Sequence, residues 1–478
     1  MKKIWKISCH ELKMHARRKS FYILLPLMQL LIITALIGGW FYVEQSVNTQ
    51  ALWQEEVHRQ WEAQPDRHPH RVAHYGNYAF RAITPLSFFD IGVNKFVGNS
   101  IYLEAHRQNS AMFSEAQMVG DNARFGQLSA ATLLLVFWPL LLINLAHASI
   151  TEERESGRLR QLLSNNLSIF HLLSGKFVAY LIIALAFLVP VFLCGGVLAS
   201  LSSVSFSNDI VLRLILLFLL YLGYSVTWLG IILCCSSFNK YSQLSLTTLI
   251  VFWLLSVIVA PRLISSFATH FYEHPSRTQF EIALAEGIAA IGDSHNPNDP
   301  HYSEFKRNIL EKYGVDKVED LPVNYAGIVM SEGEKQSAIV FRQRYESLID
   351  IFTMQNSVNR YFYWINPLLI TRTLSMKITA SDSAHFYHFE KAAEEFRFNT
   401  TQKLNELHTN EIQAATNKTQ RASRHHWQEF SPFIYKTPKL VWSLEKTLTE
   451  FIWLLFWCAL PFLIILGITK TRTLYATV

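Results

Sequence analysis

Residues 21–43, FYILLPLMQLLIITALIGGWFYV, contain no charged side chain. A helix needs about 20 apolar residues to cross the hydrocarbon core of a bilayer, so this stretch predicts a membrane-spanning helix. The segment before it, residues 1–20, is too long and too charged for the n-region of a signal peptide, and no A-x-A cleavage site follows. The first span is therefore expected to be an uncleaved signal anchor.

Five further apolar stretches are long enough to span a bilayer: residues 127–150, 177–200, 210–234, 241–261 and 451–469. Inside lipid the backbone must satisfy its own hydrogen bonds, which favours helices over open strands. The sequence therefore predicts an all-α polytopic membrane protein with six transmembrane helices. Asp and Glu are absent from the middle of every span, which argues against a proton relay and ion-driven transport.

The distribution of positive charge orients these spans. Residues 1–20 carry seven Lys or Arg and one acid, Glu11. Positive loops face the cytoplasm, so the N-terminus, the segment 151–176, Lys240 and the tail 470–478 are predicted to be cytoplasmic. Residues 44–126 and 262–450 then form two periplasmic domains of a bacterial inner-membrane protein. The net charge of +6 is thus an orientation signal and does not indicate nucleic-acid binding.

The polar parts are predicted to be mostly helical. Residues 1–20 form an amphipathic helix whose apolar face holds Trp5, Cys9, Leu12 and Ala16. This helix either lies at the lipid headgroups or packs on the protein itself. In the outer blocks we expect helices over 100–117, 331–363 and 386–416. The aromatic run YFYWINP, residues 361–367, is expected in a core that also contacts the membrane interface.

The segment between the second and third spans reads TEERESGRLRQLLSNNLSIFHLLSGK, residues 151–176. After a charged opening, Leu159, Leu163, Leu167 and Phe170 recur at helical spacing. This pattern predicts a short amphipathic helix over residues 151–170, which could serve as a handle for another protein. A plain connecting loop is the alternative.

The pattern E-R-E-x-G-x-L-x-x-L-L-S, followed by Gly175-Lys176 at the third span, resembles the coupling segment of ABC-2-type transporter permeases. The layout of six spans with both termini inside is also similar. HPHRVAHYGNYAF, residues 68–80, followed by LEAHRQN, residues 103–109, resembles a branch with large periplasmic domains and poorly defined substrates. The chain departs from the family at Arg158, often Thr, and at Asn165-Asn166, where a Gly or Pro turn is common. The resemblance implies that an ATPase is contacted by Glu152, Glu153, Arg154, Glu155, Gly157, Leu159, Leu162 and Leu163.

The resemblance further implies a non-catalytic permease subunit, expected to serve export. A second permease subunit, identical or different, would pair with it, and a separate cytoplasmic ATPase would bind ATP and magnesium. The chain itself has no P-loop, because Gly175-Lys176 is followed by Phe177 where Ser or Thr would be required. No cofactor is expected in this chain. Membrane lipid is a further expected partner, and a periplasmic partner is left open.

Two other functions remain open. The length of block 262–450 also suits a mechanotransmitter that acts on a periplasmic partner without moving a substrate. A metal-dependent membrane enzyme is the third alternative, with His68, His70 and His74 as weak candidate ligands in an H-x-H-x-x-x-H pattern. Hydrogen-bonded loop histidines explain that pattern equally well, and we predict no metal site from it.

Overall fold

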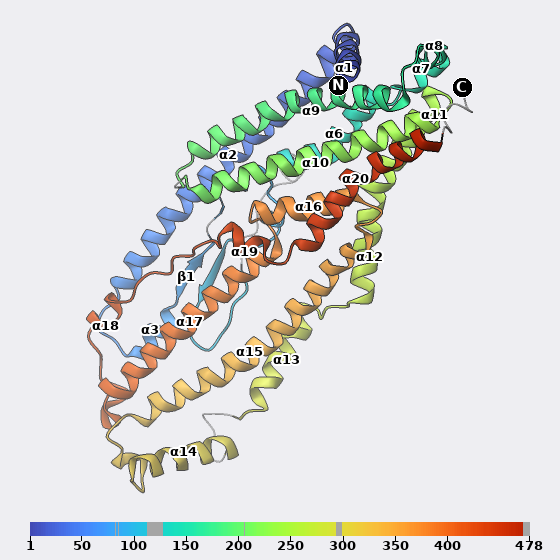
Figure 1. Cartoon of the computed structure of the whole chain (residues 1–478). Helices are drawn as coiled ribbons and strands as arrows, with labels where there is room; N and C mark the ends of the chain where they lie inside the picture. Colours follow the sequence, from blue (N-terminus) through green and yellow to red (C-terminus); the bar gives the residue numbers. More distant parts are fainter. Residues whose placement is uncertain (82, 85, 112–127, 205, 293–298, 472–478) are drawn as a thin grey trace.

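The computed structural model describes residues 1–81, 83–84, 86–111, 128–204, 206–292 and 299–471. The molecule is elongated and almost entirely helical (Figure 1). Helix α1 (Lys2–His15) and the C-terminal end of α20 (Leu448–Thr471) lie at the same end of a helical bundle, which we call the basic end. A polar lobe extends from the opposite end.

Among the described residues, six helical segments are long and apolar enough to cross a membrane, as predicted. They are α2 (Lys19–Glu62), α6 (Ala130–Ala146) with α7 (Thr151–Glu155), α9 (Ile169–Ser200), α10 (Asn208–Phe238), α11 (Ser242–Trp253) with α12 (Ala260–Phe271), and α20. The apolar window of α6 is 61% buried, whereas those of α2 and α11–α12 are 22% buried. Helix α6 is thus central, while α2, α11 and α12 present wide apolar faces outward.

The fifth span contains a π-helical turn, η1 (Leu254–Val259), between α11 and α12. Pro261 follows it and lacks the N–H that a regular helix would use, so the backbone pattern must change near this point. Asn366 compensates in part, since its Nδ2 donates to the carbonyl oxygen of Ser256 over 2.8 Å. A π-helical turn within an α-helix frequently marks a functional site.

Helix α2 is one continuous helix of 44 residues and extends well beyond the span predicted over 21–43. At 1.5 Å per residue it is about 66 Å long, roughly twice the thickness of a bilayer core. Its far end reaches the lobe, where Trp61 Nε1 donates to the carbonyl oxygen of Trp427 over 2.9 Å. One rigid element therefore runs from the basic end into the lobe (Figure 1).

The polar lobe comprises residues 52–81, 100–107, 277–292, 299–357 and 383–436. Its long helices α15 and α17 pack along one another and contain most of the two predicted outer helices, while 358–362 form a 3-10 turn. The elements of the lobe beyond α2 are α3 (Pro69–Tyr75), β1 (Asn77–Phe80), β2 (Ser100–Leu103), α13 (Arg277–Ala289), α14 (Pro300–Tyr313), α15 (Tyr325–Ser357), α17 (Ser383–Glu411), α18 (His425–Gln428) and 3-10 turns at Val318–Asp320 and Ala414–Thr416.

The helix expected over 100–117 is wrong at its start. Residues Ser100–Leu103 form β2, which pairs antiparallel with β1 so that Tyr102 lies opposite Tyr78. Ile101 and Leu103 pack into a small core with aromatic residues of α17. Because this contact is distant in sequence, local helical spacing did not reveal it. Residues 112–117 of the expected helix lie outside the described part of the chain.

The predicted outer block 262–450 contributes to the bundle as well as to the lobe. Helix α12 continues the fifth span to Phe271, and α16 (Pro367–Ile378) packs against α10 and α20 within the same apolar core as the spans. In the aromatic run before α16, Tyr363 is buried while Tyr361 and Trp364 are exposed. A short helix α19 (Leu440–Leu444) leads into α20.

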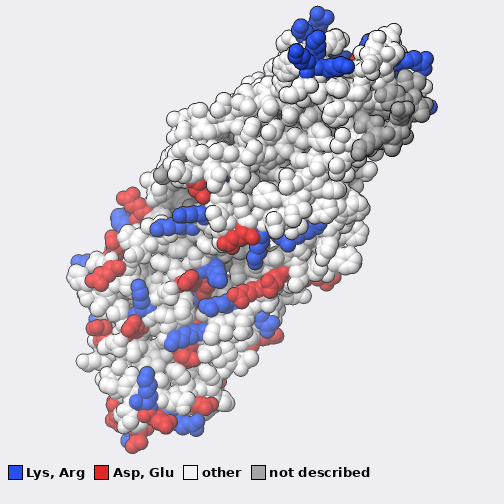
Figure 2. Space-filling view, viewed as in Figure 1, with Lys and Arg blue, Asp and Glu red and all other residues white. Residues whose placement is uncertain are grey.

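Charged side chains divide the molecule into zones. On the face shown in Figure 2, Lys and Arg gather at the basic end and mixed charges cover the lobe. On the same face, few charged side chains are visible on the bundle between them. This is the distribution expected of a protein whose bundle is surrounded by lipid.

Candidate functional site

The segment between α6 and α9 folds as two short helices at the basic end. Helix α7 ends at Glu155, and α8 (Arg158–Ser164) follows after Gly157, whose φ of 72° lies in the left-handed region that favours glycine. Asn166, with φ 59°, makes a second left-handed turn after α8. The prediction of a single helix over 151–170 is therefore wrong. The segment forms two helices, of which the second ends at Ser164, and Phe170 belongs to α9.

The three residues Glu153, Arg154 and Glu155 each bond a different span. The carboxylate Oε1 of Glu153 lies 3.2 Å from Nζ of Lys176, which belongs to α9. Because consecutive side chains on a helix diverge by about 100°, a run of three charges can serve three neighbours at once. The E-R-E run is therefore a junction between α7 and the helices around it.

Arg154 and Glu155 satisfy the ends of two further helices. Nη2 of Arg154 donates to the carbonyl oxygen of Ser237 over 2.9 Å, and Nη1 donates to that of Asn239, at the end of α10. Glu155 accepts hydrogen bonds at the start of α11 from the backbone N–H of Ser242 over 2.7 Å and from its hydroxyl over 2.9 Å. A cation at a helix C-terminus and an anion at an N-terminus complement the unpaired backbone groups there.

Lys176 is the centre of a buried ionic cluster. Its side chain is 4% exposed, and Nζ lies 2.9 Å from Oε2 of Glu11 in α1 as well as near Glu153. The hydroxyl of Tyr180 donates to Oε1 of Glu11 over 2.7 Å, and Nε2 of His15 lies 3.3 Å from the same hydroxyl. The cluster therefore joins α1, α7 and α9.

The cluster holds Glu11 in its charged form. Burial opposes ionisation, but the hydrogen bond from His15, the Lys176 ammonium and the Tyr180 hydroxyl together lower the pKa of Glu11 to about 2. Glu153 is shared with Arg158, whose Nε lies 2.7 Å from Oε2. Removing one partner from such a buried set leaves uncompensated charge, which is strongly destabilising.

Gly175 allows α1 to approach α9. A Cβ atom at this position would lie 2.6 Å from Cβ of Ile7, closer than two carbons can pack. The hydroxyl of Ser8 donates to the carbonyl oxygen of Gly175 over 2.7 Å. The two residues thus have separate roles. Gly175 lets α1 pack closely on α9, and Lys176 forms an ion pair with Glu11 of α1.

Helix α1 packs on the bundle through a mainly polar face. Ser8, Glu11 and His15 are buried there, whereas Trp5 is 59% exposed. Of the predicted apolar face, Leu12 packs partly against the core, and contact of this face with lipid headgroups stays a prediction. Trp5 and the lysines of α1 remain on the outside of the protein.

Besides the charged residues described above, the residues predicted to contact an ATPase include three leucines, Leu159, Leu162 and Leu163. Leu159 is 2% exposed in the main core, and Leu162 and Leu163 pack partly against that core. The leucines therefore anchor α8 to this protein. The outer face of α8 is polar, and its exposed residues are Arg158, Arg160, Gln161 and Ser164.

A cavity of about 610 Å³ separates α1 from α7 and α8. It is lined on one side by Lys6, His10 and Arg18 and on the other by Glu152 and Gln161. Nη2 of Arg18, at the start of α2, crosses to Oε2 of Glu152 over 2.9 Å. The segment between α6 and α9 is thus tied to the first span as well as to the third, fourth and fifth.

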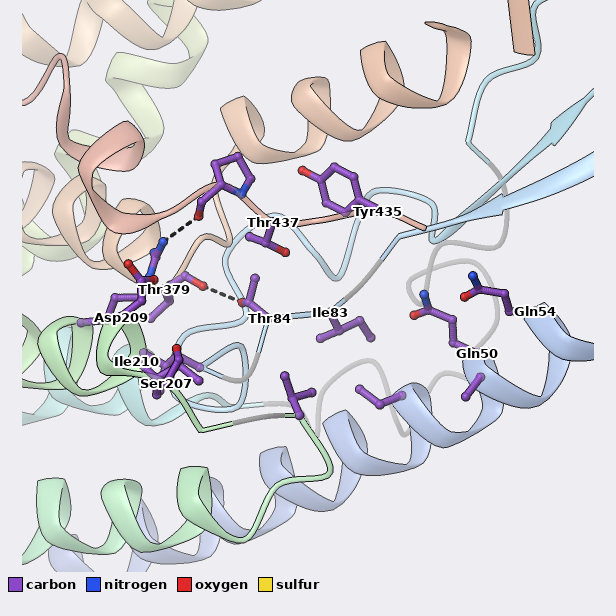
Figure 3. Close-up of a pocket in the computed structure, with 16 residues that line it drawn as sticks. Gln50, Gln54, Ile83, Thr84, Ser207, Asp209, Ile210, Thr379, Tyr435 and Thr437 are labelled. Atoms are coloured by element: carbon purple, nitrogen blue, oxygen red, sulfur yellow. Dashed lines mark hydrogen bonds and ion pairs between the residues drawn. The ribbon is translucent and has the colours of Figure 1, made fainter. Parts of the chain in front are cut away.

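A second cavity, of about 440 Å³, lies at the opposite end of the bundle where the lobe begins (Figure 3). Gln50 and Gln54 of α2 face it from one side, and Thr437 and Tyr435 from another. Thr84 Oγ1 donates to the carbonyl oxygen of Thr379 over 2.6 Å at its floor. The described residues that line it mix polar and apolar groups and form no catalytic set.

The histidines proposed from the sequence separate in the structure. His70 and His74 face each other, with their Nε2 atoms 3.2 Å apart. His68 instead accepts a hydrogen bond from the backbone N–H of His70 at Nδ1 and stacks edge-on against His408. His106, which the sequence did not single out, completes a group of three with His70 and His74. It lies in the loop after β2, distant from His74 in the sequence, and only the fold brings it there.

Two family models match the chain. Residues 101–257 match an ABC-2 family transporter protein, and this range includes α7, α8, Gly175 and Lys176. Residues 277–436 match a domain of unknown function, DUF3526, and this range covers most of the lobe. No curated protein matches the chain.

Proposed function

Because residues 101–257 match an ABC-2 family transporter, the chain is an ABC-2-type permease, and we propose that it exports a substrate with energy supplied by a separate cytoplasmic ATPase docked on α8. The observation that carries this proposal is the junction at Glu153, Arg154 and Glu155. These residues of α7 contact three different spans, and α8 follows α7 directly in the chain. Both ends of the chain and this junction would face the cytoplasm.

The docking surface is the polar outer face of α8. Its leucines are occupied by the protein's own core, so an ATPase would meet Arg158, Arg160, Gln161 and Ser164. Polar and charged contacts of this kind fix the orientation of a partner more than they add affinity. Movement of α8 would then be carried by α7 into the spans.

The path of the force follows direct contacts. From α8, Arg158 reaches Glu153, and Glu153 reaches Lys176 at the start of the third span. Arg154 and Glu155 carry the same displacement to the ends of α10 and α11. Because each step of this path is a direct hydrogen bond or ion pair, a small shift at α8 would move these helix ends together.

A second permease subunit would complete the transport path. ABC-2 permeases typically act as dimers, and α11 and α12 present exposed apolar residues on the outside of the bundle. These include Leu244, Val251, Leu263 and Phe267, together with Leu255 of the turn η1 between the two helices. We assign this face to the contact with a second subunit, with lipid covering the remaining apolar surface.

Mechanotransmission is the second candidate, and α2 favours it. The helix is unbroken from Arg18, which bonds Glu152, to Trp61, which bonds Trp427 in the lobe. Midway, Oε2 of Glu44 accepts a hydrogen bond over 3.0 Å from the backbone N–H of Ser203, in the α9–α10 loop. A displacement at the basic end would therefore reach the lobe without any substrate crossing the bundle.

The docking proposal is tested by reversing a charge on α8. Arg160→Glu in the full-length chain should lower the amount of P-loop ATPase recovered with it about tenfold, or about 1.4 kcal/mol of binding. Lys418→Glu, on an exposed position of the lobe, is the matched control and should change nothing. Equal recovery with both variants would contradict docking on α8.

The two candidate functions differ in what α2 must do. Replacing exposed Asn48 and Thr49 by glycine weakens the helix between the membrane and the lobe by about 0.3 kcal/mol per site, because Asn and Thr are themselves weak helix formers. In the complex with the ATPase, spin labels at positions 161 and 418 then report the distance between the basic end and the lobe, with and without ATP. Mechanotransmission predicts an ATP-dependent change that the glycines abolish; export without lobe movement predicts no change in either protein.

A further inference from the structure

Three imidazoles gather on the surface of the lobe. His70 and His74 stand one turn apart on α3, so both side chains leave the same face of that helix. His106 approaches from the loop after β2, and the ligand nitrogens of the three rings all lie within 4.8 Å of one another. The ring centroid of His106 lies 5.4 Å from that of His70 and 5.2 Å from that of His74.

The spacing of His70 and His74 matches that of two metal ligands. In tetrahedral zinc sites the Zn–N distance is about 2.0–2.1 Å, which places two ligand nitrogens about 3.3 Å apart. The Nε2 atoms of His70 and His74 are 3.2 Å apart. The pair is therefore already at ligand spacing, and His106, whose ligand nitrogen lies within 4.8 Å of theirs, needs to close by up to about 1.5 Å to complete three bonds.

His106 is held by a buried carboxylate. Its Nδ1 lies 3.1 Å from Oε2 of Glu334, which also accepts the backbone N–H of His106 over 3.1 Å. Nε2 is then the nitrogen left for a metal. A carboxylate on the far side of a ligand histidine fixes the ring and its tautomer in metal sites. Glu334 is itself fixed by the guanidinium of Arg397.

We propose that His70, His74 and His106 bind a zinc ion on the surface of the lobe. Three neutral imidazoles suit zinc and the other borderline divalent metals, copper and nickel. His74 and His106 are exposed, so the fourth position of the metal faces solvent. Through Glu334 of α15 and Arg397 of α17, the ion would fasten α3 and the β2 loop to the two long helices of the lobe.

Zinc binding is tested on the full-length protein, purified in detergent with a tag that contains no histidine. After dialysis against micromolar free zinc, elemental analysis should find a single zinc ion per chain in the wild type. His74→Gln should weaken binding at least about tenfold, because one of the three ligands is lost. His74 is exposed and contacts mainly His70 and His106, so this variant should fold normally.

His425→Gln is the matched control, since His425 is exposed in the lobe outside the group of three. It should bind zinc as the wild type does. Zinc should also raise the apparent midpoint of thermal unfolding of the wild type but not that of His74→Gln. No zinc in the wild type, or equal zinc in the wild type and His74→Gln, would overturn the proposal.

Discussion

Oε1 of Glu153 lies 3.2 Å from Nζ of Lys176, and this contact joins the segment between the second and third spans to the third span itself. The same ammonium lies 2.9 Å from Glu11. One buried lysine therefore connects α1, α7 and α9 at the basic end of the bundle.

Lys176→Met should destabilise the basic end. It leaves Glu11 and Glu153 facing each other in a buried site, at a cost of about 3–5 kcal/mol. We expect a lower apparent midpoint of thermal unfolding in detergent, with Lys240→Met, an exposed lysine, as the control. Adding Glu11→Gln should recover part of the loss, because one uncompensated charge is removed. A midpoint for Lys176→Met no lower than that of Lys240→Met would contradict the central role of the cluster.

Gly175→Ala should loosen α1, although alanine usually stabilises a helix by about 0.5–1 kcal/mol relative to glycine. The new Cβ would lie 2.6 Å from Cβ of Ile7, so α1 must shift. Trypsin should then cleave faster at the lysines of α1. Gly195→Ala in the same helix is the control, because its Cβ meets nothing within 4 Å. Equal cleavage of the two variants would show that the close approach at Gly175 is unimportant.

The orientation of the chain predicts which side of the membrane is labelled. In a background without native cysteines, Lys418→Cys should react with a membrane-impermeant thiol reagent applied to intact spheroplasts. Gln161→Cys should react only after permeabilisation, since the basic end faces the cytoplasm. Both positions are exposed, so a difference in their labelling reports only the side of the membrane on which each lies. The reverse pattern would overturn the orientation.

Glu390 should make the lobe less stable as the pH rises. Burial raises its pKa to about 7, against which the hydrogen bond from Tyr345 acts only in part. Between about pH 4 and 7 the folded lobe holds a proton that the unfolded chain releases, so the free energy of unfolding falls by about 3 kcal/mol. Glu390→Gln should remove this dependence and raise the apparent unfolding midpoint at pH 7.

The pH experiment compares the two proteins at pH 5 and at pH 7. Other groups titrate over this range, but they do so in both proteins, so the difference between them reports Glu390 alone. A wild type and a Glu390→Gln variant whose unfolding midpoints shift in parallel would contradict the raised pKa.

Hydropathy was sufficient for the six spans, because each span is a local property of about 20 residues. It did not reveal that α16 joins the spans, since Pro367–Ile378 is short and carries Arg372 and Lys377. Strand β2 depends on pairing with β1, and the buried face of α1 depends on Lys176, which lies 165 residues from Glu11. Such features follow from contacts distant in sequence, which periodicity does not record.

The candidate site was predicted in part. The pattern around Glu153 identified the segment that joins the spans, but it did not show that Leu159 would be buried or that Gly157 would break the helix. Likewise, the spacing of His70 and His74 suggested a pair, while His106 could be found only from the fold. The residue types indicated which segments matter, but the sequence did not show which residues they contact.

Cross-linking from α8 decides whether the ATPase meets the chain at this helix. A photoreactive amino acid at position 161, exposed on the outer face of α8, is activated in intact cells, and the adduct is identified by mass spectrometry. Coupling through α8 predicts an adduct with a protein that carries the P-loop pattern G-x-x-x-x-G-K-[ST], absent from the same experiment at position 413 in the lobe. An adduct at position 161 without a P-loop protein, or the same adduct from position 413, would contradict coupling through α8.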